Sequence, residues 1–571
     1  MPPKKAAGSA KGRPVRAAAK PQSSTKANES TTRVKPAAKS TAKAPAKKAT
    51  TKAAATKKTT TKTAAKKPAT KSAANTAAKR KATEELEDDR VNGVKRSKSS
   101  KTPEPKAPRK IAQPKAKKPR AKGPIINHAP TQPLNVYVFG EGSSGELGLG
   151  SAKGQIEVKR PRLNPLLSAD EVGVVQLAVG GMHTAVLTKD NKILTWGVND
   201  QGALGRDVTW EGGLRDIDDD KSDSGSSDSG SDTGVNPRES TPAEIDMTGL
   251  PDNLTFTQVA CTDSATFVLT DEGQVYGWGT FRSNEGIFGF DLDTCSDNNK
   301  IQPRPKLIPS LKKITQLATG ANHVLALSST GQVWAWGSGQ QNQLGRRVLE
   351  RFINQALVPT KVGVPAAMVL VGCGSYHSFA VNKNGDVYAW GLNSFGETGI
   401  PQDLGEGGES DVHGATIVEA LRGHGKVTCI EGGAHHTIAV TDSGKLLGWG
   451  RLDGYQLGLD IASLPKDDLV YDANGSPRIL TTPTQIPGID AVFCSAGSDH
   501  AIAVAKDGKA YSWGFSTTYQ TGLGTDDDVE KATHIDNTAV RGKKLVWAGC
   551  GGQFSVLAGI AGEETMVNGV H

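Results

Sequence analysis

Residues 193–205 read Ile-Leu-Thr-Trp-Gly-Val-Asn-Asp-Gln-Gly-Ala-Leu-Gly, and the repetition of this pattern decides the fold. A short apolar stretch ends in an aromatic residue and a glycine, and a polar turn then closes with Leu-Gly or a variant of it. Successive copies are separated by about 54 to 64 residues, except where an insertion lengthens one unit. The aromatic-Gly step occurs seven times, at Phe139, Trp196, Trp278, Trp336, Trp390, Trp449 and Trp513.

A second apolar stretch lies upstream of each aromatic-Gly step. Short strands joined by Gly-rich turns at this period are typical of a β-propeller, so the sequence predicts an all-β, seven-bladed propeller over residues 131–562. We expect the tryptophans to pack between sheets and the repeated histidines to bond to neighbouring loops, because equivalent residues in successive blades indicate a structural role. The repeated histidines are His183, His323, His377, His436 and His500.

The first copy also contains the pattern Gly-x-Gly-x-x-Gly, at residues 140–145. In a dinucleotide-binding enzyme such a loop would cradle a phosphate, and a crossover helix and an acidic residue would follow it. The other six copies keep the aromatic-Gly step without the phosphate pattern. We therefore reject the dinucleotide-binding interpretation.

Charge is divided unevenly along the chain. Residues 1–125 hold 36 Lys and Arg against 7 Asp and Glu, which leaves 33 against 52 for the remainder. The basic part has few large apolar residues, so we expect residues 1–130 to form a disordered tail that contacts DNA and nucleosomes through its lysines. The acidic Ser/Gly-rich run at 213–236 is expected to be a disordered insertion, and 563–571 a C-terminal tail.

Two basic clusters in the tail have the spacing of a bipartite nuclear localisation signal. A linker of about 13 residues separates them. They predict a nuclear, chromatin-associated protein that is carried by a nuclear import receptor. The clusters comprise Lys79, Arg80, Lys81, Lys95, Arg96 and Lys98.

Several classes of protein are excluded by what the sequence lacks. It has no run of 18 apolar residues for a membrane span, and its N-terminus lacks the apolar segment of a secretory signal. The six cysteines lie far apart, without the spacing of a zinc site. Because no nucleophile–base constellation is visible either, we predict no covalent catalysis, no metal and no cofactor.

Departures from the repeat are the candidate functional residues. Asp263, Asn322 and His435 occupy corresponding loops, which a propeller gathers on one face. The segment 280–287 of the third unit holds Arg282 and is expected to project from its blade.

The seven units, with Gly-Gly-Met-His-Thr at 180–184 and the third-unit segment at 278–287, resemble the regulator of chromosome condensation family over about residues 133–560. The resemblance implies a monomeric propeller that grips the GTPase Ran with one face and promotes release of GDP or GTP. A protruding wedge at 281–288 would press near the nucleotide. The implied GTPase contacts are Asp263, Phe281, Arg282, Ser283, Asn284, Glu285, Asn322, His323 and His435.

Members of this family also contact nucleosomes, and the resemblance makes Arg346, Arg347 and Arg351 candidates for chromatin contact. Ser143 and Asn322 stand where the family's pattern has acidic residues, which weakens a purely electrostatic account of the grip. The alternative interpretation is therefore a chromatin-bound propeller that acts as a scaffold without exchange activity.

Overall fold

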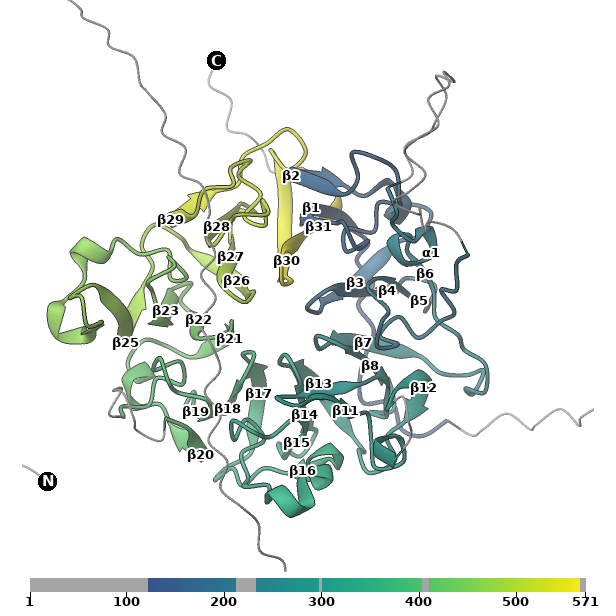
Figure 1. The fold of residues 1–571 in the computed structure, drawn as a ribbon, viewed down its shortest axis with the longest axis horizontal. Helices are drawn as coiled ribbons and strands as arrows, with labels where there is room; N and C mark the ends of the chain where they lie inside the picture. Colours follow the sequence, from purple (N-terminus) through teal and green to yellow (C-terminus); the bar gives the residue numbers. More distant parts are fainter. Residues whose placement is uncertain (1–121, 212–232, 297–299, 403–409, 565–571) are drawn as a thin grey trace, which may run out of the picture. The chain divides into compact units, whose positions relative to one another are not determined.

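The computed structural model describes residues 122–211, 233–296, 300–402 and 410–564. Within these ranges, seven sheets of four or five strands surround a central channel (Figure 1), which confirms the predicted seven-bladed propeller. Both basic clusters of the predicted nuclear localisation signal lie outside the described residues, as do 213–232 of the acidic insertion.

Six blades are each built from antiparallel strands that follow one another outward in chain order, with the first strand lining the channel, except that the outermost strand of blade 6 precedes its neighbour in the chain. Blade 2 contains β3 (Val174–Val179), β4 (His183–Thr188), β5 (Ile193–Gly197) and β6 (Ala243–Glu244); blade 3 contains β7 (Phe256–Cys261), β8 (Ala265–Thr270), β9 (Val275–Gly279) and β12 (Gln302–Leu307); blade 4 contains β13 (Ile314–Thr319), β14 (His323–Ser328), β15 (Val333–Gly337) and β16 (Thr360–Lys361). Blade 5 contains β17 (Met368–Cys373), β18 (His377–Asn382), β19 (Val387–Gly391) and β20 (Val412–Ile417); blade 6 contains β21 (Val427–Gly432), β22 (His436–Thr441), β23 (Leu446–Arg451), β25 (Pro477–Gln485) and β24 (Leu469–Tyr471); blade 7 contains β26 (Ala491–Ala496), β27 (His500–Ala505), β28 (Ala510–Gly514) and β29 (Val529–His534).

The remaining blade, blade 1, joins the two ends of the propeller. Its strands run in the order β30 (Lys543–Cys550), β31 (Phe554–Glu564), β1 (Leu134–Glu141) and β2 (Glu157–Leu163) from the channel outward. In Figure 1 the yellow C-terminal strands lie beside the blue N-terminal ones. Strands β1 and β31 pair without interruption from Leu134↔Ile560 to Gly140↔Phe554, and this pairing closes the ring and removes two open sheet edges.

Helical segments in the described residues are short and lie in the connections. They are η1 (Pro165–Leu167), α1 (Pro237–Ser240), η3 (Thr294–Ser296), η4 (Glu350–Leu357), η5 (Glu419–Leu421), η6 (Ile461–Ser463) and η7 (Lys466–Asp468). In the part of the chain that the structure describes, no helix combines the length and the apolar character needed to cross a membrane.

The repeated tryptophans and histidines link neighbouring blades, as the repeat predicts. Trp390 Nε1 donates to the carbonyl of Gln343 at 2.9 Å, and Ser378 Oγ donates to the same oxygen at 2.9 Å. His323 Nε2 lies 2.8 Å from Ser378 Oγ. The Gln343 carbonyl therefore accepts directly from the tryptophan and is linked to the histidine through the serine hydroxyl, and both contacts join blade 4 to blade 5. His436 is the exception, because both of its ring nitrogens are buried without a hydrogen-bond partner among the described residues. The same tryptophan contact is made by Trp196, Trp278, Trp449 and Trp513.

The glycine that follows each tryptophan is required by the backbone. Gly197 has φ +103° and Gly391 has φ +106°. A Cβ at either position would lie 2.4 to 2.6 Å from a carbonyl oxygen of the preceding loop. The aromatic-Gly step is therefore one packing unit: the aromatic ring fills the space between sheets and the glycine lets two backbones approach.

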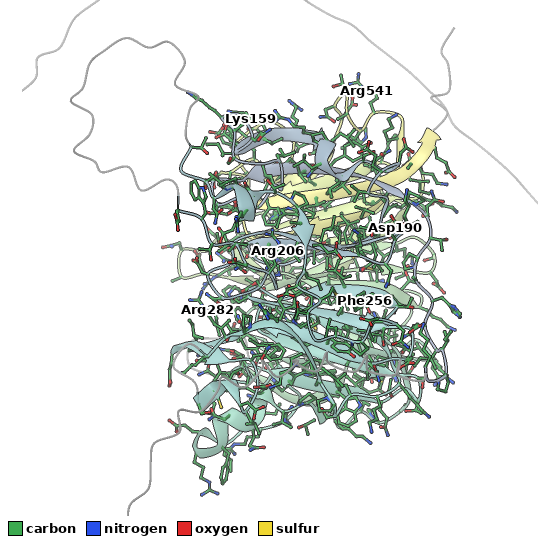
Figure 2. The ribbon with its side chains drawn as sticks, turned by 90° about the vertical axis from the view of Figure 1, so that its right-hand side faces the viewer. Lys159, Asp190, Arg206, Phe256, Arg282 and Arg541 are labelled. Carbon is green, nitrogen blue, oxygen red and sulfur yellow. The ribbon has the colours of Figure 1, made fainter. Side chains whose placement is uncertain are left out.

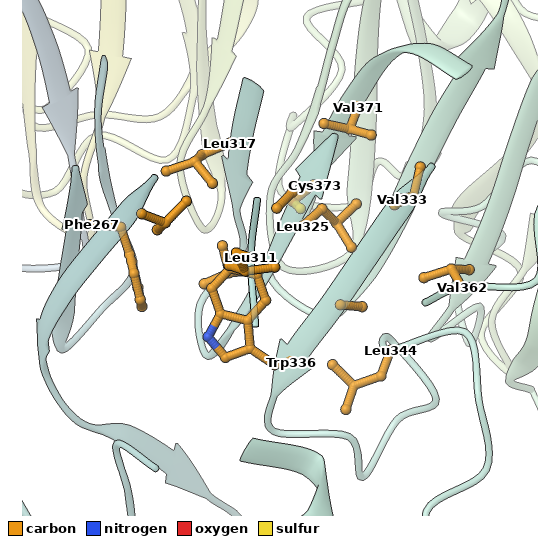
Figure 3. Close-up of a cluster of buried hydrophobic side chains, with 14 of the residues drawn as sticks. Phe267, Leu311, Leu317, Leu325, Val333, Trp336, Leu344, Val362, Val371 and Cys373 are labelled. Atoms are coloured by element: carbon orange, nitrogen blue, oxygen red, sulfur yellow. The ribbon is translucent and has the colours of Figure 1, made fainter. Parts of the chain in front are cut away.

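The largest apolar cluster among the described residues extends from blade 3 to blade 5. Figure 3 shows Trp336 and Phe267 there, with Leu311 and Leu325 around the indole ring. The rings of Phe267 and Trp336 meet edge to face, with centroids 5.7 Å apart. This cluster also receives the root of the third-unit segment, which fixes where that segment leaves the blade.

The propeller has two faces, which we name by their loops. The front face carries the loops that join the first and second strands and the third and fourth strands of each blade, and the back face carries the second-to-third turns. Figure 2 shows Arg282 at the front edge and Asp190, in the turn between β4 and β5, at the opposite edge. Backbone hydrogen bonds join successive front loops, from Asp263 to Ala321 and from Ala321 to Ser375, so these loops are held relative to one another.

Residues 122–127 form an arm on the back face that ties two blades together. Asn127 Nδ2 donates to the carbonyls of Thr270 and Ile314, each at 2.9 Å, and thereby joins blade 3 to blade 4. Lys122 forms an ion pair of 2.6 Å with Asp271.

We expect Asn127→Ala to lower the free energy of unfolding by about 1–2 kcal/mol, because two carbonyl oxygens each lose the hydrogen bond from this side chain. Urea unfolding of the full chain measures this change. His128→Ala is the control, since the His128 side chain is exposed, and an equal loss in the two variants would contradict the role given to Asn127.

Candidate binding face

A two-stranded hairpin stands between the third and fourth strands of blade 3. It consists of β10 (Phe281–Ser283) and β11 (Gly286–Gly289). Phe281 is fully buried and stacks on Phe267 and Phe290, with ring centroids 6.0 and 6.2 Å apart. The hairpin is thus anchored at its root by an aromatic side chain while its tip, residues 282–287, lies at the surface.

Asn322 holds the hairpin from the neighbouring blade. Its Oδ1 accepts the backbone N–H of Arg282 at 2.8 Å. Nearer the tip, Gln340 Oε1 accepts the N–H of Asn284 at 2.6 Å. An asparagine supplies this acceptor as well as an aspartate would, so the missing acid at position 322 does not loosen the hairpin.

The hairpin forms one wall of a pocket of about 470 Å³ on the front face. Asp263 lies in this pocket, and its side chain reaches solvent although protein surrounds it closely. Burial raises the pKa of the Asp263 carboxyl to about 6, and the charge of Arg282 opposes that shift. The pocket therefore presents a carboxylate above this pH, close to the exposed guanidinium of Arg282. The pocket is lined by Asp263, Arg282, Ser283, Asn284 and Asn322, which the sequence predicted, and also by Met182, Asp200 and Tyr376.

Two residues that were predicted to contact the GTPase directly have buried side chains, and this corrects the prediction. His323 is 0% exposed, its Nε2 is bonded to Ser378, and burial lowers its pKa to about 3. Phe281 is likewise 0% exposed. A partner cannot touch either side chain without opening the core, so His323 supports the blade junction and Phe281 anchors the hairpin.

The structure places His435 in a second cluster on the front face, outside the lining of the pocket. Its side chain is 28% exposed, and its ring centroid lies 4.6 Å from that of Phe395. Its Nδ1 lies 3.4 Å from Oε1 of Glu397, whose side chain is fully buried. The sequence motif predicted that His435 shares a face with Asp263, and it gave no sign of the buried carboxylate partner of His435.

Three pocket residues were missed by the sequence analysis. Met182 is an apolar side chain with 44% exposure in the loop before His183. Asp200 lies in the quoted turn of the second unit, and Tyr376 precedes the repeated His377. The sequence could have indicated these residues by their position, because each lies in a front-face loop of a repeat unit, as Asp263 does.

The three arginines predicted for chromatin contact divide into two kinds. The Arg346 guanidinium donates to the carbonyls of Ala335 and Val358, at 3.0 and 3.3 Å, and burial lowers its pKa to about 10. Arg346 therefore shapes the loop that contains η4. Arg347 and Arg351 are exposed, and the Arg351 guanidinium lies 5.0 Å from the ring centroid of Phe352.

The described residues contain no group of three or more His, Cys, Asp or Glu side chains that could hold a metal ion. What the front face offers is an anchored projection, a carboxylate pocket and an imidazole with its own carboxylate. These groups suit recognition of another protein surface by charge and hydrogen bonds.

Comparison with known proteins assigns the family. A model of the RCC1-like domain matches residues 135–557. The chain belongs to the RCC1-like domain family.

Relatives of this RCC1-like propeller cover most of its length. Protein pim1 of Schizosaccharomyces pombe is 44% identical over 449 residues, which is 78% of this chain and 78% of pim1. Guanine nucleotide exchange factor SRM1 of Saccharomyces cerevisiae is 42% identical over 443 residues, which is 75% of this chain and 88% of SRM1. The crystal structure of Saccharomyces cerevisiae Prp20p, reported with its binding properties to Gsp1p and histones, matches with a TM-score of 0.68 at 39% identity over 76% of this chain and 95% of that chain.

Proposed function

We propose that this RCC1-like propeller is a guanine nucleotide exchange factor for the small GTPase Ran. The observation that carries the proposal is the β10–β11 hairpin, which is anchored in the core by Phe281 and projects beside the Asp263 pocket. The similarity to SRM1, which is named a guanine nucleotide exchange factor, supports the same activity.

The proposed mechanism requires no covalent step. An exchange factor that binds the nucleotide-free GTPase more tightly than the loaded form weakens nucleotide binding by the same coupling free energy. Each tenfold gain in release corresponds to about 1.4 kcal/mol, so an acceleration of about 10⁵ needs roughly 7 kcal/mol of differential binding. A rigid projection that displaces phosphate or Mg²⁺ contacts provides interactions that exist only when the nucleotide has left.

Residues of the front face take separate roles in this mechanism. Arg282, Ser283, Asn284 and Glu285 form the projecting part of the hairpin, which presses against the GTPase. Asp263 supplies a carboxylate for a basic group of the partner. His435 contacts a different part of the same partner, and the excess of acidic residues after residue 125 steers a basic surface toward the propeller.

Nucleotide release tests the proposal. The full chain is added to Ran loaded with fluorescent GDP, and excess unlabelled GDP starts the exchange. The proposal predicts release that is faster by several orders of magnitude at catalytic amounts of the chain. Release at the intrinsic rate would reject exchange activity and favour the alternative, a chromatin-bound scaffold.

The Asp263 carboxyl predicts a pH dependence for exchange. Because its pKa is raised to about 6, the group is charged above that pH and becomes neutral as the pH falls through it. We expect kcat/KM for GDP release to fall over this range in the unaltered chain, and to be low and free of this step in Asp263→Asn. Asp190→Asn removes an exposed acid from the opposite face and serves as the control. Persistence of the step in Asp263→Asn would contradict the assignment.

We also propose that the protein is nuclear and associates with chromatin. Residues of the N-terminal tail and exposed residues of the propeller both contribute to this association. Residues 1–121 of the predicted tail would bind DNA and histones, and the basic clusters there would bind an import receptor, whereas residues 122–127 are held against the propeller. Arg347 and Arg351 add an exposed basic surface on the propeller. The reported histone binding of Prp20p and the solved complex of Kap60 with yeast RCC1 (Prp20) support these assignments.

Nucleosome binding tests the chromatin proposal. Deleting residues 1–121 should weaken binding at physiological salt by more than tenfold, because many phosphate contacts are lost together. Arg347→Ala with Arg351→Ala should cause a smaller loss. Unchanged binding after the deletion would reject the tail as the contact.

A further inference from the structure

Among the described residues, one position of the repeat closes the front-face turn with its own side chain in five blades. It is the residue before Leu-Gly or Thr-Gly, and it accepts the backbone N–H two residues earlier. Gln343 caps Gln341 at 2.9 Å, Gln456 caps Gly454 at 3.0 Å, and Gln520 caps Thr518 at 3.0 Å. A neutral amide oxygen is thus sufficient for this structural task.

Two blades have glutamate at the capping position. Glu146 Oε2 accepts the N–H of Ser144 at 2.9 Å in blade 1, and Glu397 Oε2 accepts the N–H of Phe395 at 2.6 Å in blade 5. Since glutamine makes the same cap elsewhere, the negative charge of Glu397 is not needed for the turn. A buried charge is costly unless it is paired, and the Glu397 side chain has a second contact besides the turn.

That second contact is His435. The remaining oxygen of Glu397, Oε1, lies 3.4 Å from His435 Nδ1, which is slightly longer than the usual N–H···O limit of about 3.2 Å. The described residues show no such histidine bonded to Glu146. Glu397 therefore joins the Phe395 backbone to the His435 ring across the junction of blades 5 and 6.

Packing holds the ring in the same arrangement. The Phe395 ring lies 4.6 Å from the imidazole and is flanked by the guanidinium groups of Arg478 and Arg451, at 4.8 and 5.4 Å. The arginines are held in turn by Asp453. The imidazole thus has one edge against a carboxylate and one side against an aromatic ring, and it is left partly exposed on the front face.

We propose that Glu397 is a positioning residue that fixes His435 in the Nδ1–H tautomer and leaves Nε2 as a hydrogen-bond acceptor for the GTPase. A carboxylate only accepts hydrogen bonds, so Nδ1 must carry the proton that faces it. In the neutral ring, Nε2 then has a lone pair, and the partner group that it fits is an N–H or O–H donor. The GTPase part of this inference rests on the proposed function; the tautomer does not.

Glu397→Gln tests the proposal because it keeps the hydrogen bond to the Phe395 N–H and replaces the acceptor that faces His435 with a donor. The amide oxygen is needed for the Phe395 N–H, as in Gln343, which turns the NH₂ group toward His435. A donor at that point favours a lone pair on Nδ1 and therefore the Nε2–H tautomer. Glu146→Gln is the matched control, since it makes the same chemical change at the same repeat position.

The tautomer is read from ¹⁵N chemical shifts of the histidine ring nitrogens in the full chain, at about pH 8, where an unperturbed imidazole is neutral. The His435 signals are assigned by their loss in His435→Gln. We expect Nδ1–H in the unaltered chain and in Glu146→Gln, and Nε2–H in Glu397→Gln. An Nε2–H tautomer in the unaltered chain, or the same tautomer in all three, would overturn the proposal.

Exchange kinetics test the GTPase part. We expect Glu397→Gln to raise KM for loaded Ran on the order of tenfold, with kcat nearly unchanged. The reason is that Nε2 of His435 changes from a hydrogen-bond acceptor to a donor and then faces the donor group of the GTPase. Equal KM values in Glu397→Gln and Glu146→Gln would overturn the acceptor role. If the unaltered chain shows no exchange at all, the proposed function fails, while the tautomer measurement still decides whether Glu397 positions His435.

Discussion

Replacing residues 282–287 with a Gly-Ser linker of equal length is expected to reduce the acceleration of GDP release by about 10³-fold or more, because most of the differential binding is assigned to this projection. Phe281 is retained in this variant, so the apolar cluster beneath the hairpin keeps its anchor. Fluorescent GDP release measures the effect, and the urea midpoint of the variant shows whether the propeller is still folded.

The tip of the β24–β25 hairpin in blade 6 provides a matched control for this variant. Residues 472–476 connect these two strands and lie almost entirely at the surface. The same Gly-Ser replacement there should leave GDP release within about twofold, since a surface change away from the proposed contact costs little. Equal losses in the two variants would contradict the role given to β10–β11.

Trp390→Ala is expected to lower the free energy of unfolding by about 3–5 kcal/mol, the usual cost of truncating a buried tryptophan. The side chain is 0% exposed, and its Nε1 bonds to the Gln343 carbonyl of the neighbouring blade. The variant leaves a cavity between blades 4 and 5 and removes a contact that Trp196, Trp278, Trp449 and Trp513 also make. Urea unfolding of the full chain measures the change.

Trp334→Ala serves as the control for that prediction. Trp334 is only half-buried on β15, where Lys361 lies 5.4 Å from its ring centroid. Its truncation should cost clearly less, on the order of 1 kcal/mol. If the two tryptophan variants lost equal stability, the structural explanation of the repeated Trp-Gly step would be wrong.

The architecture was predictable because each blade repeats the same packing. The repeated tryptophan predicts an aromatic ring packed between sheets, and the glycine after it predicts a close approach of two backbones. The positive φ of Gly197 and Gly391 confirms that these positions need glycine. Blade closure was less visible: the sequence alone does not say that β1 and β31 pair, because those strands lie at opposite ends of the propeller.

The site was predictable only where it departs from the repeat. Asp263 and Arg282 break the pattern and prove to line one pocket. Met182 and Tyr376 line that pocket as well, and the signal for them in the sequence was their place in front-face loops of the repeat. His323 illustrates the opposite error, because it follows Asn322 in a front loop while its own side chain points into the core.

The role of Glu397 also required the structure. In sequence it is one of several residues that precede Leu-Gly or Thr-Gly, and its acidic side chain, which separates it from the glutamines at this position, is shared by Glu146. Only the spatial arrangement shows that its second oxygen faces His435, a residue of the next blade. Contacts between blades depend on the geometry of the ring, which the repeat pattern does not specify.

The most direct test of differential binding is the affinity of the full chain for nucleotide-free Ran and for GDP-loaded Ran, measured by surface binding under identical salt conditions. The account predicts that the nucleotide-free form binds tighter by several orders of magnitude, and that excess GDP dissociates the complex by the reciprocal factor. Equal affinity for the two forms would contradict it, because a chain that binds both states equally shifts no equilibrium.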